Sequence, residues 1–450
     1  MSRPPFAAVI LAAGMGTRMK SALHKVLHPV AGRPMLLHLL DSVDDLAPAA
    51  WVVVVGAGRD QVEAALAGRA VIAVQEEQRG TAHAVRMAER ALAGFDGDIV
   101  VLYGDTPLVR AATVARMLDR LHAPDAPAVV VLASRPADPL TYGRVIADAD
   151  GRIEKMVEYR DATPQERAVD LCNSGLLAAR AADLWPLLAR VGSANAAGEF
   201  YLPDIVALAA VDGRASVVVE TAADEVAGIN SRAELAAVEA AWQTRRRAQA
   251  MAEGASLLAP ETVWFSWDTV IGRDVTIGQN TVFGPGVTVA DGVTIHPFCH
   301  IEGATIATGA DIGPYARLRP GAEIADGARI GNFVEVKKAR IAPGAKVNHL
   351  SYIGDATVGA GANIGAGTIT CNYDGFNKSR TEIGAGAFIG SNSALVAPVA
   401  IGPGAIVGAG STITRNVAAD ALAVARGRQE ERPGWAARFR DKMRAKKKKG

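Results

Sequence analysis

The chain has 450 residues, a formal net charge of +1, 50% hydrophobic and 21% charged residues. This apolar content can offset the entropy of ordering the backbone and excludes wholesale disorder, while the length suggests two or three domains. Three widely spaced cysteines without a CxxC pair argue against a disulfide framework and a zinc ribbon. No apolar run reaches transmembrane length and no signal-peptide pattern is present, so we expect a cytoplasmic protein without membrane insertion.

Residues 1–230 alternate short apolar runs with helical patterns. Runs such as AAVILAAG, WVVVVGAG and DIVVLYGD are continuously apolar rather than alternating. Parallel strands that are buried on both faces have this composition. The pattern predicts a Rossmann-like α/β domain whose parallel sheet is covered by helices on both faces.

An alanine-rich stretch over residues 231–253 separates this region from the rest. It begins with Ser231 followed three residues later by Glu234, which is a capping-box pattern, and it ends at Gly254. We expect a single long helix that links two domains.

From residue 254 onward, aliphatic residues recur every six positions, as from Ile271 to Ile301, and small residues often follow them. Glycine is abundant, at 46 residues, and aromatic residues are only 5%. The repeat predicts a left-handed parallel β-helix of hexapeptide repeats over residues 254–425. The period breaks between Val336 and Ile353 and again between Ile369 and Ile383, and we expect surface loops at both breaks.

The C-terminal segment, residues 426–450, differs electrostatically from the rest of the chain. It holds 11 Lys and Arg against 3 Asp and Glu, a net +8, which leaves −7 for the other 425 residues. A lysine-rich terminus is usually a solvated tail.

The first candidate site follows the first predicted strand, in LAAGMGTRMKSALHKVL. Glycines such as Gly14 let backbone N–H groups approach phosphate oxygens, and Arg18 and Lys25 can neutralise a triphosphate. The segment is neither a GxGxxG motif nor a Walker loop, and a glycine-rich turn can simply connect a strand to a helix. Asp105 follows a later strand, at the sheet edge where α/β proteins bind ligands, although an Asp before Thr-Pro can also be a turn residue.

The pattern LAAGxGTRM, with a lysine seven residues after Arg18, resembles the sugar-1-phosphate nucleotidyltransferases. Its form is typical of the bacterial bifunctional uridyltransferase and acetyltransferase that makes UDP-N-acetylglucosamine, and QEEQRGTAHAV, YGDTPL and VAGIN are similar to further motifs of that family. The resemblance implies an N-acetylglucosamine site at Gly143, Glu158 and Asn173, and Mg²⁺ held by Asp105 and Asn230. It implies a nucleotide site at Leu11, Ala12, Ala13, Gly14, Arg18, Lys25, Gln75, Gly80, Thr81, Tyr103, Gly104 and Asp105.

The second candidate site lies in the region of broken period, which concentrates lysines around His349. A histidine beside basic groups can act as a general base next to a phosphate, although a lone histidine in a turn can also be an ordinary surface residue. Cys371 could carry an acetyl group covalently, but we favour a small buried hydrophobic residue.

The same region, together with GSNSALVAPV and LAVARGRQ, resembles the acetyltransferase half of that family. The resemblance implies that His349 accepts a proton from the amine of glucosamine-1-phosphate as the amine attacks acetyl-CoA. It also implies that Arg319 and Lys337 bind the phosphate, that Tyr352 and Asn363 hold the sugar, and that the active protein is a homotrimer with shared sites. The implied acetyl-CoA residues are Ala366, Asn372, Tyr373, Ser391, Ala409 and Arg426.

These features predict an enzyme that converts glucosamine-1-phosphate, acetyl-CoA and UTP to UDP-N-acetylglucosamine through N-acetylglucosamine-1-phosphate, for peptidoglycan and lipopolysaccharide precursors. One alternative is another nucleotidyltransferase, such as an ADP-glucose or mannose-1-phosphate enzyme, whose β-helix only regulates or oligomerises; His349 and the NYDG segment argue against it. The other is a non-enzymatic scaffold whose tail binds nucleic acid or an anionic membrane. We expect no nucleic-acid partner.

Overall fold

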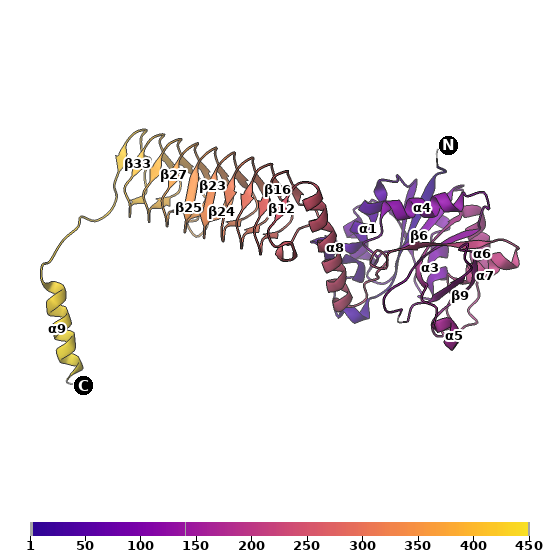
Figure 1. The fold of residues 1–450 in the computed structure, drawn as a ribbon. Helices are drawn as coiled ribbons and strands as arrows, with labels where there is room; N and C mark the ends of the chain where they lie inside the picture. Colours follow the sequence, from indigo (N-terminus) through magenta and orange to yellow (C-terminus); the bar gives the residue numbers. More distant parts are fainter. Residues whose placement is uncertain (1–2, 140, 449–450) are drawn as a thin grey trace. The chain divides into compact units, whose positions relative to one another are not determined.

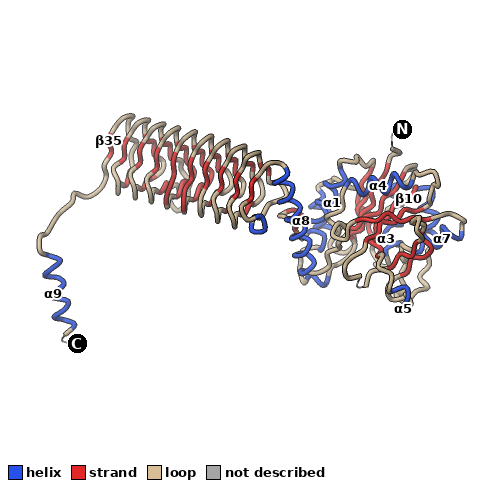
Figure 2. The backbone as a smooth tube through the Cα atoms, in the orientation of Figure 1, coloured by secondary structure: helices blue, strands red, loops and turns tan. Residues whose placement is uncertain are grey.

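The computed structural model describes residues 3–139 and 141–448. The chain divides into two compact units, with the boundary between Arg246 and Arg247. Figures 1 and 2 show the fold of both units.

The first unit is built on a nine-stranded sheet (Figure 2). Strands β8 (Arg144–Ala147) and β9 (Ile153–Val157) extend the sheet through β10, and β2 (Pro29–Val30) pairs with β3 (Arg33–Pro34) outside it. The order of its seven main strands is β11 (Ser216–Thr221), β7 (Val129–Ser134), β10 (Cys172–Arg180), β6 (Asp98–Tyr103), β1 (Phe6–Ala12), β4 (Ala50–Val55) and β5 (Val71–Val74).

Helices cover both faces of this sheet, as the continuously apolar strands predict. Alternate residues of β1 face opposite sides, with Ala8 and Ile10 in one buried cluster and Ala7 and Val9 in the other. The first cluster includes residues of α1 (Met35–Asp44), α2 (Arg59–Leu66) and α4 (Ala111–Leu121). The second includes residues of α3 (Thr81–Met87), α6 (Ala181–Arg190) and α7 (Asp204–Val211). Shorter helices are α5 (Pro164–Arg167), η1 (Thr17–Met19), η2 (Lys25–Leu27) and η3 (Arg90–Leu92).

The expectation of an entirely parallel sheet is wrong at β10. This strand lies between β6 and β7 and is antiparallel to both. Its sequence, CNSGLLAAR, begins with polar and small residues, and its register with β7 shifts between Asn173 and Leu177. It therefore lacks the Val/Ile run by which the other central strands are recognised.

The predicted linking helix is α8 (Arg232–Ala252). The backbone N–H of Glu234 donates to Ser231 Oγ at 3.2 Å, and that of Asn230 donates to Glu234 Oε2 at 2.7 Å. The chain leaves the helix at Gly254, whose φ is +109°. The boundary between the two compact units falls within α8, after Arg246.

The second unit is a parallel β-helix whose short strands stack in three columns. One column contains β12 (Ser256–Leu257), β14 (Thr276–Ile277), β17 (Thr294–Ile295), β20 (Asp311–Ile312), β23 (Arg329–Asn332), β25 (Lys346–His349), β27 (Asn363–Ile364), β30 (Phe388–Ile389), β33 (Ile406–Val407) and β35 (Leu422–Ala423). The second contains β15 (Val282–Phe283), β18 (His300–Ile301), β21 (Arg317–Leu318), β24 (Glu335–Ile341), β26 (Tyr352–Val358), β28 (Ile369–Cys371), β31 (Ala394–Val396) and β34 (Thr412–Ile413). The third contains β13 (Val270–Ile271), β16 (Thr288–Val289), β19 (Ala304–Ile306), β22 (Ala322–Ile324), the second halves of β24 and β26, β29 (Thr381–Ile383) and β32 (Val399–Ile401). A short helix, η4 (Pro260–Thr262), lies in the first coil.

The aliphatic residues with a period of six fill the interior of the β-helix. Ile277, Val289, Ile295 and Ile301 are all buried, and equivalent positions pair coil to coil, as Ile277 does with Ile295. Each coil therefore contributes one layer of small aliphatic side chains to a narrow core.

The two breaks in the period have different structural causes. Val336 pairs directly with Ile353, because β24 and β26 continue through the corners at Lys338 and Asp355, so the expected loop at the first break is wrong. At the second break, residues 372–380 form a loop between β28 and β29, as expected.

The C-terminal segment contains α9 (Trp435–Lys447), and every residue of this helix is exposed. Within the described part of the chain, no helix is both long and apolar enough to cross a lipid bilayer.

Candidate functional sites

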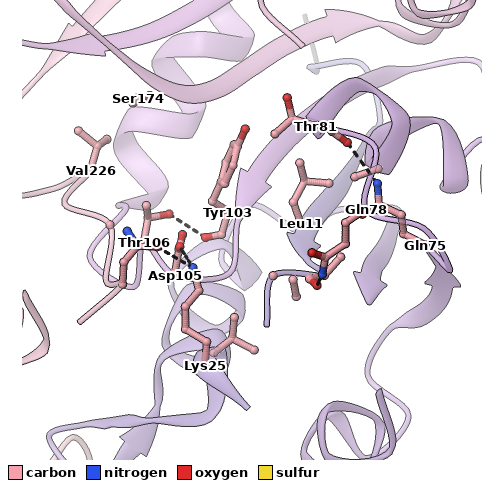
Figure 3. Close-up of a pocket in the computed structure, with 18 of the residues that line it drawn as sticks. Leu11, Lys25, Gln75, Gln78, Thr81, Tyr103, Asp105, Thr106, Ser174 and Val226 are labelled. Atoms are coloured by element: carbon pink, nitrogen blue, oxygen red, sulfur yellow. Dashed lines mark hydrogen bonds and ion pairs between the residues drawn. The ribbon is translucent and has the colours of Figure 1, made fainter. Parts of the chain in front are cut away.

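A cavity of about 470 Å³ opens at the carboxyl edge of the sheet of the first unit (Figure 3). Strands β1 and β6 are parallel neighbours, with Leu11 opposite Tyr103, so the chain leaves both strands at the same edge. Gly104 N–H donates to Leu11 O at 3.0 Å and ties the two exits together. The cavity brings together most of the predicted nucleotide residues: Leu11, Ala12, Ala13, Gly14, Lys25, Gln75, Gly80, Thr81, Tyr103, Asp105 and Asn230.

The centre of this cavity is a cluster of Lys25, Asp105 and Asn230. The Lys25 ammonium forms an ion pair with Asp105 Oδ2 and donates to Asn230 Oδ1 at 3.1 Å. The Lys25 and Asp105 side chains are only 11% and 14% exposed, so solvent screens the pair weakly. A Cβ on Gly16, whose φ is +63°, would lie 2.6 Å from Lys25 Cβ, so only glycine lets the loop fold over this lysine.

These residues fit a divalent cation. A carboxylate oxygen and an amide oxygen already converge on one positive charge, and both are hard ligands that Mg²⁺ accepts. Among the described residues, no group of three or more His, Cys, Asp or Glu could hold a metal. The remaining ligands would have to be water and substrate phosphate oxygens.

The loop before α3 closes another side of the cavity. Gln75 is buried, and its Nε2 donates to Gly80 O at 3.2 Å. Gln78 Nε2 donates to Ala13 O at 2.5 Å and so joins this loop to the glycine-rich segment. Gln78 was not predicted, although it lies three residues after Gln75 in the same motif.

The three residues predicted to hold the sugar lie together, but they are not among those that line the cavity. Asn173 N–H donates to Gly143 O at 2.9 Å, and a Cβ on Gly143 would lie 3.3 Å from Glu158 Oε1. Burial raises the pKa of the Glu158 carboxyl, and the neighbouring Asp161 adds to this effect. Tyr103 lines the cavity, and burial together with the charges of Asp105 and Glu158 raises the pKa of its phenol.

Some residues that line the cavity were not predicted, and two predicted nucleotide residues, Arg18 and Gly104, do not line it. Arg18 is exposed on η1 and is not among the residues that line the cavity. Thr106, Ser174 and Gly228 adjoin predicted motif residues, which is the signal that could have found them. Tyr142 adjoins the predicted Gly143, and Val226 begins the VAGIN motif, whereas Glu199, which also lines the cavity, comes from a segment without a comparable pattern.

In the β-helix, several predicted residues follow one another along a single corner. His349, Ala366, Ser391 and Ala409, which we call the corner strip, occupy equivalent positions in successive coils. The backbone shows this alignment, since three of the carbonyls accept a bond from the next coil: His349 O from Gly367 N at 3.2 Å, Ala366 O from Asn392 N at 2.7 Å, and Ser391 O from Gly410 N at 2.8 Å. The side chain of Arg426 donates from Nη1 to Ala409 O at 2.8 Å.

Arg319, Lys337 and Tyr352 lie in the adjacent column. Arg319 N–H donates to Val336 O at 2.9 Å, which places Arg319 and Lys337 in successive coils. Lys337 pairs with Gly354, where an added Cβ would lie 2.3 Å from Tyr352 Oη, so the Tyr352 ring lies over this glycine. Asn363 belongs to β27, in the column of His349 rather than that of these three residues.

The charges in this column are arranged to attract an anion. Arg319 Nη1 forms an ion pair with Glu335 Oε1 at 2.8 Å, but Lys337 lies beside another cation, Lys378 of the 372–380 loop. The charges of Lys378 and Arg319 lower the pKa of the Lys337 ammonium. Lys378 was not predicted, because only the fold brings its loop next to β24. Adjacent ammonium groups of this kind suit a phosphate.

The remaining predicted residues lie on the 372–380 loop and next to it. Asn372 is buried and its Nδ2 donates to the Asp355 carboxylate, whereas Tyr373 is 59% exposed. Cys371 is half-buried rather than buried, so its description as a buried hydrophobic residue is wrong. It is the last residue of β28 and directly precedes the 372–380 loop.

An α/β sheet with a polar cavity at its carboxyl edge, followed by a β-helix of hexapeptide coils, is the architecture of a two-domain transferase. Residues 8–167 match the MobA-like NTP transferase domain family, and residues 268–303 and 380–415 match the bacterial transferase hexapeptide family.

Whole-chain relatives agree with this class. The "Bifunctional protein GlmU" of Sphingopyxis alaskensis is 68% identical over 98% of each chain, that of Rhizorhabdus wittichii 69% over 99% of each, and that of Zymomonas mobilis 63% over 98% of this chain and 99% of its own. The chain belongs to the GlmU family of bifunctional proteins. It is an enzyme with a nucleotidyltransferase and an acyltransferase activity.

Proposed function

We propose that residues 254–425 acetylate glucosamine-1-phosphate with acetyl-CoA, and that residues 1–230 then transfer UMP from UTP to N-acetylglucosamine-1-phosphate. The products are UDP-N-acetylglucosamine, a cytoplasmic precursor for peptidoglycan and lipopolysaccharide, and pyrophosphate. One observation carries the proposal: a single chain contains both the Lys25, Asp105 and Asn230 cluster and a corner strip that begins at His349.

In the uridylyl step, an oxygen of the sugar phosphate forms a bond to the α-phosphorus of UTP while the bond to the bridging oxygen of pyrophosphate breaks. No protein nucleophile is needed, so the chain contributes positioning and charge. Lys25 and Arg18 neutralise the phosphates, Gln75 and Gly80 hold the base, and Gly143, Glu158 and Asn173 hold the sugar. Lys25, Gln75 and Gly80 line the cavity, which supports their part of this arrangement, and Arg18 has to move inward from its exposed position.

Asp105 and Asn230 are the residues that would hold Mg²⁺ in this domain. When bound, the ion supplies further positive charge at the phosphate oxygens. The convergence of both side chains on the Lys25 ammonium supports this assignment.

In the acetyl step, the amine nitrogen of glucosamine-1-phosphate attacks the thioester carbonyl of acetyl-CoA, the carbon–sulfur bond breaks, and the thiolate leaves. His349 accepts the proton that the amine loses. Arg319 and Lys337 bind the sugar phosphate, Tyr352 and Asn363 orient the sugar, and acetyl-CoA lies along the corner strip with Asn372, Tyr373 and Arg426. The order of the strip along one corner supports this arrangement.

We also propose that the active form is a homotrimer. Phe298, Tyr315 and Phe333, which we call the aromatic ladder, stack at one corner of the β-helix with ring centroids 4.9 and 5.1 Å apart, and all three are at least 43% exposed. Exposed stacked aromatic rings next to a site are the composition of a subunit interface. The separation of Asn363 from Arg319 and Lys337 within one chain also favours a site completed by a second copy.

The oligomer can be tested by sedimentation. The double variant Phe298→Ser, Tyr315→Ser should sediment as a smaller species and lose acetyl transfer but keep uridylyl transfer. Val211→Ser, which removes an even more exposed apolar side chain from the first unit, should leave both properties unchanged. A double variant that keeps the wild-type size would contradict the interface.

The two half-reactions test the assignment of sites. Asp105→Ala should abolish uridylyl transfer and leave acetyl transfer intact, and His349→Ala should do the reverse. Acetyl transfer that persists without His349, or that is lost without Asp105, would show that the two sites are wrongly assigned.

A further inference from the structure

The side chain of Asn332 forms a short contact with the ring of His349. Strands β23 and β25 are parallel neighbours, with Asn332 opposite His349, and Asn332 Oδ1 lies 2.6 Å from His349 Nδ1. An amide oxygen can only accept a hydrogen bond, so Nδ1 must carry the proton of this bond. The neutral ring then has its lone pair on Nε2.

The backbone around this pair is tightly fixed. A Cβ on Gly331 would lie 1.9 Å from Asn348 O, so only glycine allows the two strands to approach this closely just before the pair. The carbonyl of His349 accepts bonds from Ser351 Oγ at 2.8 Å and from Gly367 N at 3.2 Å. With the backbone held, the orientation of the imidazole ring depends on its side-chain partner.

Another histidine in the same β-helix has a different partner. His296 Nε2 lies 2.8 Å from Asp311 Oδ1, which is a histidine–carboxylate pair. A carboxylate stabilises the charged imidazolium, whereas a neutral amide orients the ring without adding charge. His349, which has to be neutral to accept a proton, has the amide.

The Asn332–His349 pair and the His296–Asp311 pair line one groove. The charged groups of this groove determine the electrostatic field at His349. Among the described residues that line this groove, Asp311 is the only carboxylate, and its Oδ1 faces His296. The other charged or titratable group besides the histidines and Tyr315 is Arg329, at the start of β23. Asn332 is therefore the partner that contacts the His349 ring directly.

We propose that Asn332 is a positioning residue for acetyl transfer: its amide oxygen holds His349 in the Nδ1–H tautomer, so that Nε2 is free to accept the proton of the substrate amine. The inference rests on the proposed role of His349 as the base. It adds a residue that no motif indicated, since an asparagine at the end of a short strand has no distinctive pattern.

Kinetics of the full-length chain can test this role, because uridylyl transfer in the same molecule reports on folding. Asn332→Ala should lower kcat for acetyl transfer about 10- to 100-fold, as expected for a misoriented base. KM for glucosamine-1-phosphate should stay within about 2-fold, since phosphate and sugar contacts are retained. Uridylyl transfer should not change.

The conservative variant Asn332→Asp separates positioning from simple packing. It keeps an acceptor oxygen but adds a negative charge, which raises the pKa of His349. The acidic limb of the pH profile of kcat for acetyl transfer should therefore move to higher pH. On the alkaline side of this profile, kcat of Asn332→Asp should lie within about 3-fold of the wild-type value. Asp311→Asn, which changes the partner of His296, should leave the acetyl-transfer profile unmoved.

The outcomes distinguish this inference from the proposal on which it rests. If His349→Ala retains acetyl transfer, the proposed base is wrong. If His349→Ala abolishes it but Asn332→Ala keeps full kcat, or if the Asn332→Asp profile does not shift, the positioning role of Asn332 alone is overturned.

Discussion

The ammonium of Lys25 forms an ion pair with the carboxylate of Asp105, 80 residues away in the sequence, inside the cavity of the α/β unit. The same ammonium donates to Asn230. Both proposed Mg²⁺ ligands thus contact the side chain that we propose to neutralise the phosphates of UTP. Metal and lysine cannot occupy one position, so Lys25 must leave these oxygens when the ion binds.

Replacing Lys25 should therefore strengthen metal binding to the free enzyme. With Mn²⁺ as the probe and no nucleotide, Lys25→Met should bind about 3- to 10-fold tighter than wild type by calorimetry, because a competing positive charge is gone. Uridylyl transfer by the same variant should fall. Lys20→Met, which removes an exposed lysine from the same loop, should bind Mn²⁺ like wild type. Equal affinities for wild type and Lys25→Met would exclude competition.

Lys378 should contribute to the affinity for the sugar phosphate in the acetyltransferase site. Lys378→Met should raise KM for glucosamine-1-phosphate about 10-fold with little change in kcat, because one charge-assisted contact is lost. The difference from wild type should shrink at high salt. Arg340→Met, an exposed change in the second half of β24, should not alter KM. A Lys378→Met enzyme with the wild-type KM would remove this residue from the site.

Buried histidines should make the first unit sensitive to acid. His24 is 6% exposed, both its ring nitrogens are without a hydrogen-bond partner in the described structure, and burial and the charge of Lys25 lower its pKa from the ordinary 6.5. The unfolded chain therefore binds the proton more readily than the folded one. The contribution of neutral His24 to the free energy of unfolding is therefore fully present above about pH 6.5. It is lost as the pH falls through the pKa of His24 in the folded state, which lies below 6.5.

Scanning calorimetry between pH 7.5 and pH 5 should show this loss as a falling unfolding temperature. His24→Leu should reduce the slope, although burial also lowers the pKa values of His28, His38 and His83, so part of the slope should remain. His300→Gln, at an exposed position of the β-helix, is the matched control. An unchanged slope in His24→Leu would show that this histidine does not contribute.

Gly331→Ala should disrupt the β-helix locally. The added methyl group would lie 1.9 Å from Asn348 O, a backbone atom that cannot move without separating β23 from β25. We expect a destabilisation of about 2–3 kcal/mol by denaturant unfolding, with loss of acetyl transfer. Gly192→Ala, where nothing lies within 4 Å of the added carbon, should be nearly neutral. A fully stable Gly331→Ala protein would contradict this packing.

Local periodicity in the sequence determined the architecture of both units. Continuous apolar runs such as AAVILAAG, WVVVVGAG and DIVVLYGD identified strands of the first sheet, and the spacing of six identified the β-helix. Burial on both faces of a sheet or inside a narrow coil constrains neighbouring residues directly. The glycine-rich segment and Asp105 were placed at the correct sheet edge for the same reason. Strand β10 was missed because its residues CNSGLLAAR carry no such period.

Only the tertiary structure decided which side chains meet. Lys25 and Asn230 are 205 residues apart, and Asn332 and His349 are 17 apart in successive coils, so their contacts depend on strand order and register rather than on local pattern. The position of Lys378 beside Lys337 also depends on the fold rather than on local pattern. So does the first break in the period, where β24 and β26 continue without a loop. The sequence determined the elements and their motifs, whereas packing between distant segments decided the partners of each reactive group.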